Sequence, residues 1–213
     1  MKLILLGAPG AGKGTQAEIL CERLNIPTIS TGTMIREAMK SGTEMGLKAK
    51  EYAENGKLVP DEVVIGIVDE RLRQDDCQNG FILDGYPRTV PQAHLLDKVL
   101  ADLGLTLDCV VYLKVADDVI LQRLTARVSC KDCKAIYNRL FMPPKKEGIC
   151  DQCGGELIQR ADDSLETAQN RLKVFYEQTS PLLDLYRERG LVYERSELDL
   201  DKATRMLLEE LEK

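Results

Sequence analysis

Short apolar runs alternate with stretches of helical spacing along the chain. Residues 2–6 ("KLILL") stop at Gly7, and from Lys13 onward apolar residues recur about one helical turn apart. Further runs at 81–84 ("FILD") and 108–115 ("DCVVYLKV"), with weaker ones at 27–30 and 191–195, predict buried strands. Strands that alternate with helices in this way predict an α/β fold, a parallel sheet covered by helices on both faces.

Two stretches interrupt the alternation. Residues 31–60 have a helical pattern throughout and contain no strand pattern. Residues 128–160 carry four of the seven cysteines and Pro143-Pro144, without a convincing helix. Both are interpreted as insertions mounted near the edge at which an open α/β sheet binds its ligand.

Composition limits the class of protein. A chain of 213 residues supports one good-sized core, and its 44% hydrophobic and 30% charged residues are ordinary for a globular protein. The net charge of −6 argues against a protein that coats nucleic acid, because that task needs a basic face. No apolar run is long enough for a signal peptide core or a membrane span. Together with a cysteine-rich sequence, this indicates a cytoplasmic protein with no membrane partner.

A glycine-rich loop carries the first chemical signal. Residues 7–16 read "GAPGAGKGTQ" and match G-x-x-x-x-G-K-[ST] up to its last position, where Gly14 replaces the hydroxyl residue and Thr15 follows. Backbone N–H groups, the start of a helix and Lys13 together form an anion site. The spacing favours a site for a nucleoside triphosphate over a flexible turn.

Four cysteines form a second signal. Cys130 and Cys133 are separated by sixteen residues from Cys150 and Cys153, and each pair has C-x₂-C spacing. Four thiolates at this spacing indicate a closed, structural, tetrahedral Zn²⁺ site, although iron or another soft metal is chemically possible. Cys21 and Cys109 lie in apolar patterns and are interpreted as core residues, and His94 is interpreted as a surface or helix-packing residue.

The glycine loop resembles that of the nucleoside monophosphate kinases, specifically the adenylate kinases, in which Gly commonly follows the Lys. The resemblance continues, in the family's order, through "STGTMIR" (30–36), "GKLVPDE" (56–62), "LDGYPRT" (83–89), "RADD" (160–163) and "QTSPLLDLY" (178–186). It implies a P-loop three-layer α/β fold with a five-stranded parallel sheet. The implied division is a core of residues 1–29, 60–126 and 164–213, a helical AMP-binding insertion at 30–59, and a small zinc-binding β lid at 127–163.

The implied reaction is Mg·ATP + AMP ⇌ 2 ADP, carried out by phosphate positioning and Lys/Arg electrostatics under a closing lid. By resemblance the catalytic residues are Lys13, Asp84, Arg88, Arg127, Arg160 and Arg171. The implied ATP-binding residues are Gly10, Ala11, Gly12, Lys13, Gly14, Thr15, Arg123, Arg127, Ile136 and Tyr137. The implied AMP-binding residues are Thr31, Arg36, Lys57, Leu58, Val59, Gly85, Arg88, Gln92, Arg160 and Arg171.

Some roles and departures follow from the same resemblance. Asp84 would order the water shell of Mg²⁺, and Gln92 would reach the adenine edge of AMP. Thr33 stands where many relatives carry an Asp that helps hold the metal's waters, which leaves Asp84 as the main carboxylate. The segment "SELDL" after residue 195 matches the family poorly, so no adenine contact is assigned there. ATP, AMP and ADP are the implied partners of a monomer.

Two alternatives remain open from the residues. A kinase for another nucleoside monophosphate, such as UMP or CMP, shares the loop, but those relatives usually have a short lid. A P-loop protein that binds nucleic acid through its zinc ribbon is supported by the lysines at 131, 134, 145 and 146. The acidic total charge and the AMP-side motifs argue against it, so no nucleic-acid partner is expected.

Overall fold

The central sheet is parallel and five-stranded. The computed structural model describes residues 1–41, 47, 49–52, 57–196 and 209. The sheet order is β2-β3-β1-β4-β8, so β1 lies in the middle, with Leu3 in register with Ile82 on one side and Cys109 on the other. Its strands are β1 (Lys2–Gly7), β2 (Thr28–Ser30), β3 (Phe81–Asp84), β4 (Cys109–Leu113) and β8 (Val192–Arg195). All five apolar runs therefore form strands, which confirms the predicted fold class.

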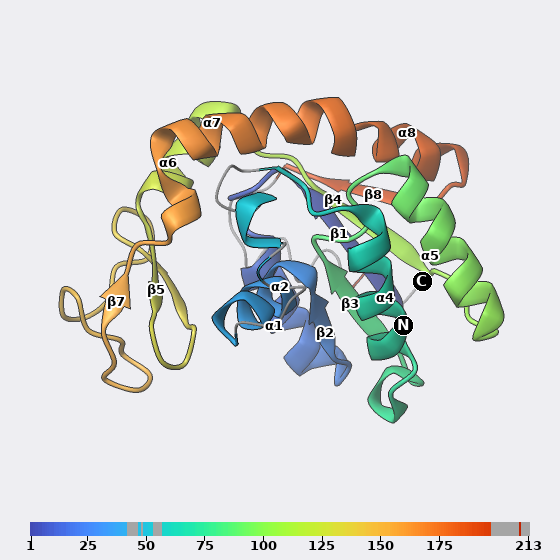
Figure 1. Cartoon of the computed structure of the whole chain (residues 1–213), viewed down its shortest axis with the longest axis horizontal. Helices are drawn as coiled ribbons and strands as arrows, with labels where there is room; N and C mark the ends of the chain where they lie inside the picture. Colours follow the sequence, from blue (N-terminus) through green and yellow to red (C-terminus); the bar gives the residue numbers. More distant parts are fainter. Residues whose placement is uncertain (42–46, 48, 53–56, 197–208, 210–213) are drawn as a thin grey trace.

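Helices cover both faces of this sheet. They are α1 (Lys13–Leu24), α2 (Thr31–Lys40), α4 (Asp61–Leu72), α5 (Val90–Asp102), α6 (Asp117–Thr125), α7 (Leu165–Val174) and α8 (Pro181–Glu188). Side chains of a strand point alternately to opposite faces, so Leu3 and Leu5 of β1 pack in the cluster that contains Leu20 of α1. Ile4 and Leu6 instead join the cluster made with α4, α5 and α8. The result is the three-layer arrangement seen in Figure 1.

A second, smaller sheet lies at one end of the molecule. Its strands β5 (Arg127–Cys130), β6 (Ile136–Asn138) and β7 (Leu157–Ile158) are antiparallel in the order β6-β5-β7. Figure 1 shows β5 and β7 beyond α6 and the start of α7, well away from the central sheet. This sheet forms from the stretch that lacked a helical pattern.

The predicted helix over 31–60 is only partly correct. α2 ends at Lys40, positions 47 and 49–52 are helical, and residues 57–60 form no helix. Pro60 explains the last point, because proline disfavours helical backbone in the residue before it. Residues 42–46, 48 and 53–56 lie outside the described part of the chain.

Short turns complete the chain. η1 (Asp75–Cys77) and η2 (Ala161–Asp163) are 3₁₀ turns, and η3 (Phe175–Thr179) is a π-helical turn between α7 and α8. Within η3, the Thr179 hydroxyl donates a hydrogen bond to the backbone oxygen of Arg88 at 2.8 Å. This hydrogen bond connects α7, η3 and α8, which run across the top of Figure 1, to the loop that follows β3. Among the residues described, no helix is long and apolar enough to cross a membrane.

Candidate active site

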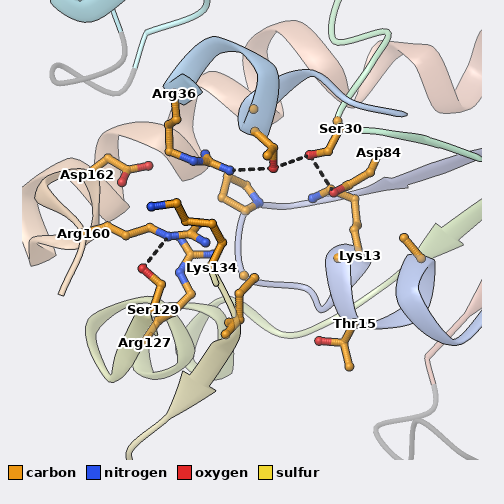
Figure 2. A pocket seen from close by; sticks show the side chains of 18 of the residues that line it. Lys13, Thr15, Ser30, Arg36, Asp84, Arg127, Ser129, Lys134, Arg160 and Asp162 are labelled. Carbon is orange, nitrogen blue, oxygen red and sulfur yellow. Dashed lines mark hydrogen bonds between the residues drawn. The ribbon is translucent and has the colours of Figure 1, made fainter. Parts of the chain in front are cut away.

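A cleft of about 1790 Å³ opens at the carboxyl ends of the strands. It is bounded by the glycine loop, α2, the loop after β3 and the small sheet, which is where an open α/β sheet binds ligands. Every residue assigned above to ATP or AMP lines this cleft except Ala11. Ala11 is buried in the core cluster that contains Leu3 and Leu5 of β1 and Leu20 of α1. Figure 2 shows charged side chains facing the cleft from opposite sides.

The glycine loop has the backbone that an anion site requires. Gly10 and Gly12 have positive φ angles of 85° and 97°, and Gly12 is the residue before α1. A Cβ on Gly10 would lie 2.9 Å from Leu124 Cγ, so the loop also packs too closely against α6 for a side chain. The loop N–H groups and the start of α1 are therefore held in one arrangement.

Lys13 lies across this loop. Its Nζ donates to the backbone oxygens of Gly7, at 2.8 Å, and Ala8, at 3.0 Å. Burial lowers the pKa of Lys13 to about 8, although Asp84 nearby raises it. An ammonium group that is costly to charge in the free protein gains strongly from an anionic ligand.

Gly14 leaves room between the loop and Asp84. A Cβ at this position would lie 3.9 Å from Asp84 Oδ2 and 4.0 Å from Ile136 Cδ1, both ordinary contacts. A longer side chain would occupy the space between the loop, the Asp84 carboxylate and β6. Thr15 lines the cleft one residue further along α1.

A chain of hydrogen bonds connects the Asp84 carboxylate to two hydroxyl groups and then to a guanidinium group (Figure 2). Ser30 Oγ donates to Asp84 Oδ2 at 3.3 Å, Thr33 Oγ1 donates to Ser30 Oγ at 3.2 Å, and Arg36 Nη2 donates to Thr33 Oγ1 at 3.2 Å. Thr33 thus connects Arg36 to Ser30 and, through it, to the Asp84 carboxylate. Sequence reasoning did not single out Ser30.

The guanidinium groups of Arg36 and Arg88 lie close to Gly32, and that of Arg88 also lies close to Gly85. A Cβ on Gly32 would lie 3.2 Å from Arg36 Nη1 and 3.7 Å from Arg88 Nη2, and one on Gly85 would lie 3.2 Å from Arg88 Nη2. Burial, and next the neighbouring Arg171, lowers the pKa of Arg88 to about 10. Two guanidinium groups this close disfavour each other's charge, so an anion placed between them is stabilised.

Two further arginines are held by two aspartates. Arg127 makes a two-pronged ion pair with Asp163 at 2.7 and 2.5 Å, and Asp163 is fully buried. Arg171 Nη1 contacts Asp162 at 2.8 Å and Asp163 at 3.2 Å. Asp163 therefore joins β5 to α7. Sequence reasoning missed both aspartates, although they are the last two residues of the "RADD" motif.

Arg160 precedes these aspartates and points back to the small sheet. Its Nε donates to Ser129 Oγ at 3.4 Å (Figure 2). Burial, and next Arg127 and Arg36, lowers the pKa of Arg160 to about 10. Burial likewise lowers the pKa of Arg36. The cleft therefore holds a group of arginines whose mutual repulsion an anionic ligand relieves.

The remaining residues assigned to AMP form the wall opposite the small sheet. Thr31 is buried and donates to the backbone oxygen of Gly85 at 2.9 Å. Gln92 on α5 is 1% exposed, yet it lines the cleft. Lys57, Leu58 and Val59 line the same wall, with Lys57 exposed and Val59 buried.

Arg123 contacts the glycine loop from α6, whereas the hydroxyl of Tyr137 is directed toward the cysteines. Arg123 Nη1 donates to the backbone oxygen of Ala11 at 3.4 Å, and its guanidinium lies 5.8 Å from the ring centre of Phe141. The Tyr137 hydroxyl accepts a hydrogen bond from the Asp151 N–H at 2.9 Å and lies 3.5 Å from Cys150 Sγ. That hydroxyl belongs to the cysteine cluster, while Ile136 beside it faces Gly14.

The four predicted cysteines come together. Their sulfur atoms all lie within 4.8 Å of one another, with Cys130 and Cys153 at 3.4 Å and Cys133 and Cys150 at 3.5 Å. Four sulfurs around a tetrahedral Zn²⁺ at about 2.3 Å stand about 3.8 Å apart, so the cluster has the size that the ion needs. A Cβ on Gly155 would lie 3.0 Å from Cys130 Sγ, so a side chain at position 155 would crowd the cluster.

The comparisons with known proteins agree with one another. A model of the adenylate kinase family matches residues 5–191. The chain is 58% identical over 192 residues to the adenylate kinase of Caldicellulosiruptor saccharolyticus, covering 90% of this chain and 89% of the relative. It is 55% identical over 203 residues to that of a Geobacillus species, covering 95% and 94%. The adenylate kinase of Archaeoglobus fulgidus is 53% identical over 194 residues, covering 91% and 89%.

The chain belongs to the adenylate kinase family. Adenylate kinases are nucleoside monophosphate kinases, so the chain is a phosphotransferase, as the motif order predicted. The glycine loop with Gly14 lies within the matched residues 5–191. The four-cysteine cluster fits the long-lid type within the adenylate kinase family.

Proposed function

We propose that this chain catalyses reversible phosphoryl transfer from Mg·ATP to AMP, giving two ADP. The observation that carries the proposal is the convergence of Lys13, Arg36, Arg88, Arg127, Arg160 and Arg171 on one cleft beside a P-loop. Phosphoryl transfer needs two phosphates held in line and positive charge around the oxygens of the transferred group. Membership of the adenylate kinase family supports the same reaction.

On the donor side, backbone N–H groups of residues 10–15 hold the ATP phosphates, and Lys13 leaves the carbonyls of Gly7 and Ala8 to follow the transferred group. Arg123 and Arg127 approach the donor nucleotide from α6 and β5, and Ile136 and Tyr137 lie beside it. Asp84, at the end of β3, would order the water shell of the Mg²⁺ that comes with ATP, and the ion would neutralise phosphate charge.

On the acceptor side, Arg36 and Arg88 hold the AMP phosphate, and Arg160 and Arg171 stabilise the group in transfer. Thr31, Gly85, Gln92 and residues 57–59 enclose the nucleoside. No general base is required of the protein, because the AMP phosphate is a competent nucleophile at neutral pH. The task of the side chains is positioning and charge stabilisation.

Closure of the AMP-binding insertion and the lid over the bound nucleotides excludes water, which would otherwise receive the phosphoryl group. We assign residues 30–59 to an AMP-binding insertion and 127–163 to a lid, with the remainder as the core. Cys130, Cys133, Cys150 and Cys153 hold a structural Zn²⁺ that stabilises the lid and takes no part in the chemistry. The protein acts as a cytoplasmic monomer.

The test is ADP formation from Mg·ATP with AMP, GMP, CMP or UMP as the second substrate. Turnover confined to AMP or its deoxy form is expected. Preference for a pyrimidine monophosphate would keep the phosphoryl-transfer mechanism and overturn the acceptor. Failure to transfer to any of them, with ATP still bound, would contradict the proposed function.

A further inference from the structure

Both polar atoms of the Gln92 side chain are hydrogen-bonded within the protein, although the residue lines the cleft. Its Oε1 accepts a hydrogen bond from the Arg88 N–H at 2.7 Å, and its Nε2 donates to Asp61 Oδ1 at 2.6 Å. Its own N–H donates to Thr89 Oγ1 at 3.2 Å, at the start of α5. The residue is 1% exposed, so these bonds form away from bulk water.

The two side-chain bonds determine which way the amide faces. A backbone N–H can only donate and an ionised carboxylate can only accept, so Arg88 requires Oε1 and Asp61 requires Nε2. Turning the amide over would place Oε1 against the carboxylate and Nε2 against the N–H. In a buried site both polar atoms would lose their partners, which is costly.

The Asp61 carboxylate is itself held in place. Its second oxygen, Oδ2, accepts a hydrogen bond from Thr89 Oγ1 at 3.2 Å. Asp61 is the first residue of α4, where the helix N-terminus favours a negative charge. Asp61, Thr89 and Gln92 thus link the starts of α4 and α5 through one polar network.

A fixed amide presents a fixed pattern to a ligand. Oε1 keeps one free lone pair and Nε2 keeps one free hydrogen. Adenine offers an N6–H donor beside an N1 acceptor, which matches this pattern. Hypoxanthine offers an O6 acceptor beside an N1–H donor, which fits only the reversed amide.

We propose that Asp61 is a positioning residue that locks the Gln92 amide in its adenine-reading orientation and so sets the preference for AMP over IMP. The proposal rests on the proposed function, because it takes Gln92 to face the base of the acceptor nucleotide. Asp61 acts through Gln92 and need not touch the nucleotide. AMP and IMP are nearly the same size, so the amide orientation, rather than the shape of the cleft, discriminates between them.

The experiment measures kcat/KM with AMP and with IMP for the wild type, Asp61→Ala and Asp61→Asn. Losing the charged acceptor should lower the AMP/IMP ratio by about tenfold or more in Asp61→Ala. Asp61→Asn should lower it less, because its own amide presents either an oxygen or an NH₂ group to Gln92. Glu62→Gln is the matched control: it removes an exposed charge from the same helix end and should leave the ratio unchanged.

A double variant separates positioning from a general structural effect. In a Gln92→Ala background the further change Asp61→Ala should not alter the ratio, because the group that Asp61 positions is gone. An unchanged ratio in Asp61→Ala, or an equal fall with and without Gln92, overturns the lock. Melting temperatures identify variants that fail to fold, and Asp61→Asn then carries the test. A wild type that does not phosphorylate AMP overturns the proposed function, and the lock with it.

Discussion

The central sheet and the small sheet of the proposed lid, β6-β5-β7, both place cationic side chains at the cleft, but the two sheets are stabilised by different interactions. In the core, β1 runs through the middle of the sheet, and Leu3, Ile4 and Leu5 are at most 1% exposed. The lid has a buried cluster of only five residues, two of which, Cys130 and Cys150, belong to the cysteine cluster.

The lid also exposes apolar side chains that a larger unit would bury. Leu140, Phe141 and Met142 are 64%, 54% and 45% exposed. Apolar burial therefore stabilises the core. For the lid, we propose that its four cysteines, holding Zn²⁺, and the ion pair between Arg127 and Asp163 supply the stability that its few buried apolar side chains do not. Four experiments test whether the two regions differ in this way.

The largest effect is expected in the core, from Lys13→Ala. Turnover should fall by about a thousandfold, because a preorganised cation next to the transferred group is lost. The melting temperature should hardly change, since Nζ contacts only two loop carbonyls. Steady-state kinetics and thermal denaturation provide the measurements. Lys114→Ala, an exposed lysine paired with Glu194, is the control, and near-normal turnover in Lys13→Ala would refute the phosphate-site assignment.

Asp163 pairs with Arg127 of β5 and Arg171 of α7 and so forms a joint between the lid and the core. Asp163→Asn tests this joint. This change leaves Arg127 and Arg171 without their buried partner, and breaking such a pair costs about 3 kcal/mol. The melting temperature should fall by about 6–12 °C. Turnover should also fall, because Arg127 loses the carboxylate that positions it, whereas Arg171 keeps its contact with Asp162.

The matched control for the joint is Asp97→Asn, which breaks a two-pronged ion pair with Arg189 at 2.9 and 2.8 Å on the surface. An exposed pair contributes about 1 kcal/mol or less. Equal melting temperatures for the two variants would show that burial of Asp163 contributes nothing to the joint.

The lid alone is tested by Cys150→Ala. Bound zinc should fall from about one ion per chain to almost none, because a closed tetrahedral site needs all four ligands. Limited proteolysis should then cut between residues 131 and 156 while core fragments persist, and the melting temperature should fall more than the rate of the chemical step.

Cys21→Ala, at a cysteine on α1 without a partner thiol, is the control for the lid and should keep its zinc. Unchanged melting after Cys150→Ala or after treatment with a chelator would refute the structural zinc site. Cutting of the core at the same rate as the lid would refute the claim that the two regions are stabilised separately.

The smallest effect concerns the protonation of Lys13. Burial lowers its pKa to about 8, so near pH 9 the free protein holds mostly the neutral amine. A bound triphosphate favours the ammonium form and raises this pKa, so binding takes up a proton, and affinity falls as the pH rises through this range. Calorimetry at about pH 9 in buffers of different ionisation enthalpy measures the uptake. Lys13→Arg, which stays charged, should show none; equal uptake in both would contradict the assignment to Lys13.

Local patterns predicted most of the fold and many residues around the cleft. The strand at residues 81–84 and the glycine loop follow from neighbours in the chain, since apolar periodicity and turn chemistry act over a few residues. Two C-x₂-C turns likewise predicted the cluster at Cys130, Cys133, Cys150 and Cys153. The helix predicted up to residue 60 failed where Pro60 opposed it.

The chemical groups can be read from the amino-acid sequence: a phosphate loop, a set of arginines, four cysteines and a glutamine in the family's order. How these groups are held depends on the fold. The pairing of Arg127 with Asp163 and the lock of Asp61 on Gln92 join residues 36 and 31 positions apart. Nothing in local propensity encodes such contacts, because they exist only after the sheet has brought separate loops to one edge and burial has made each unpaired polar atom costly.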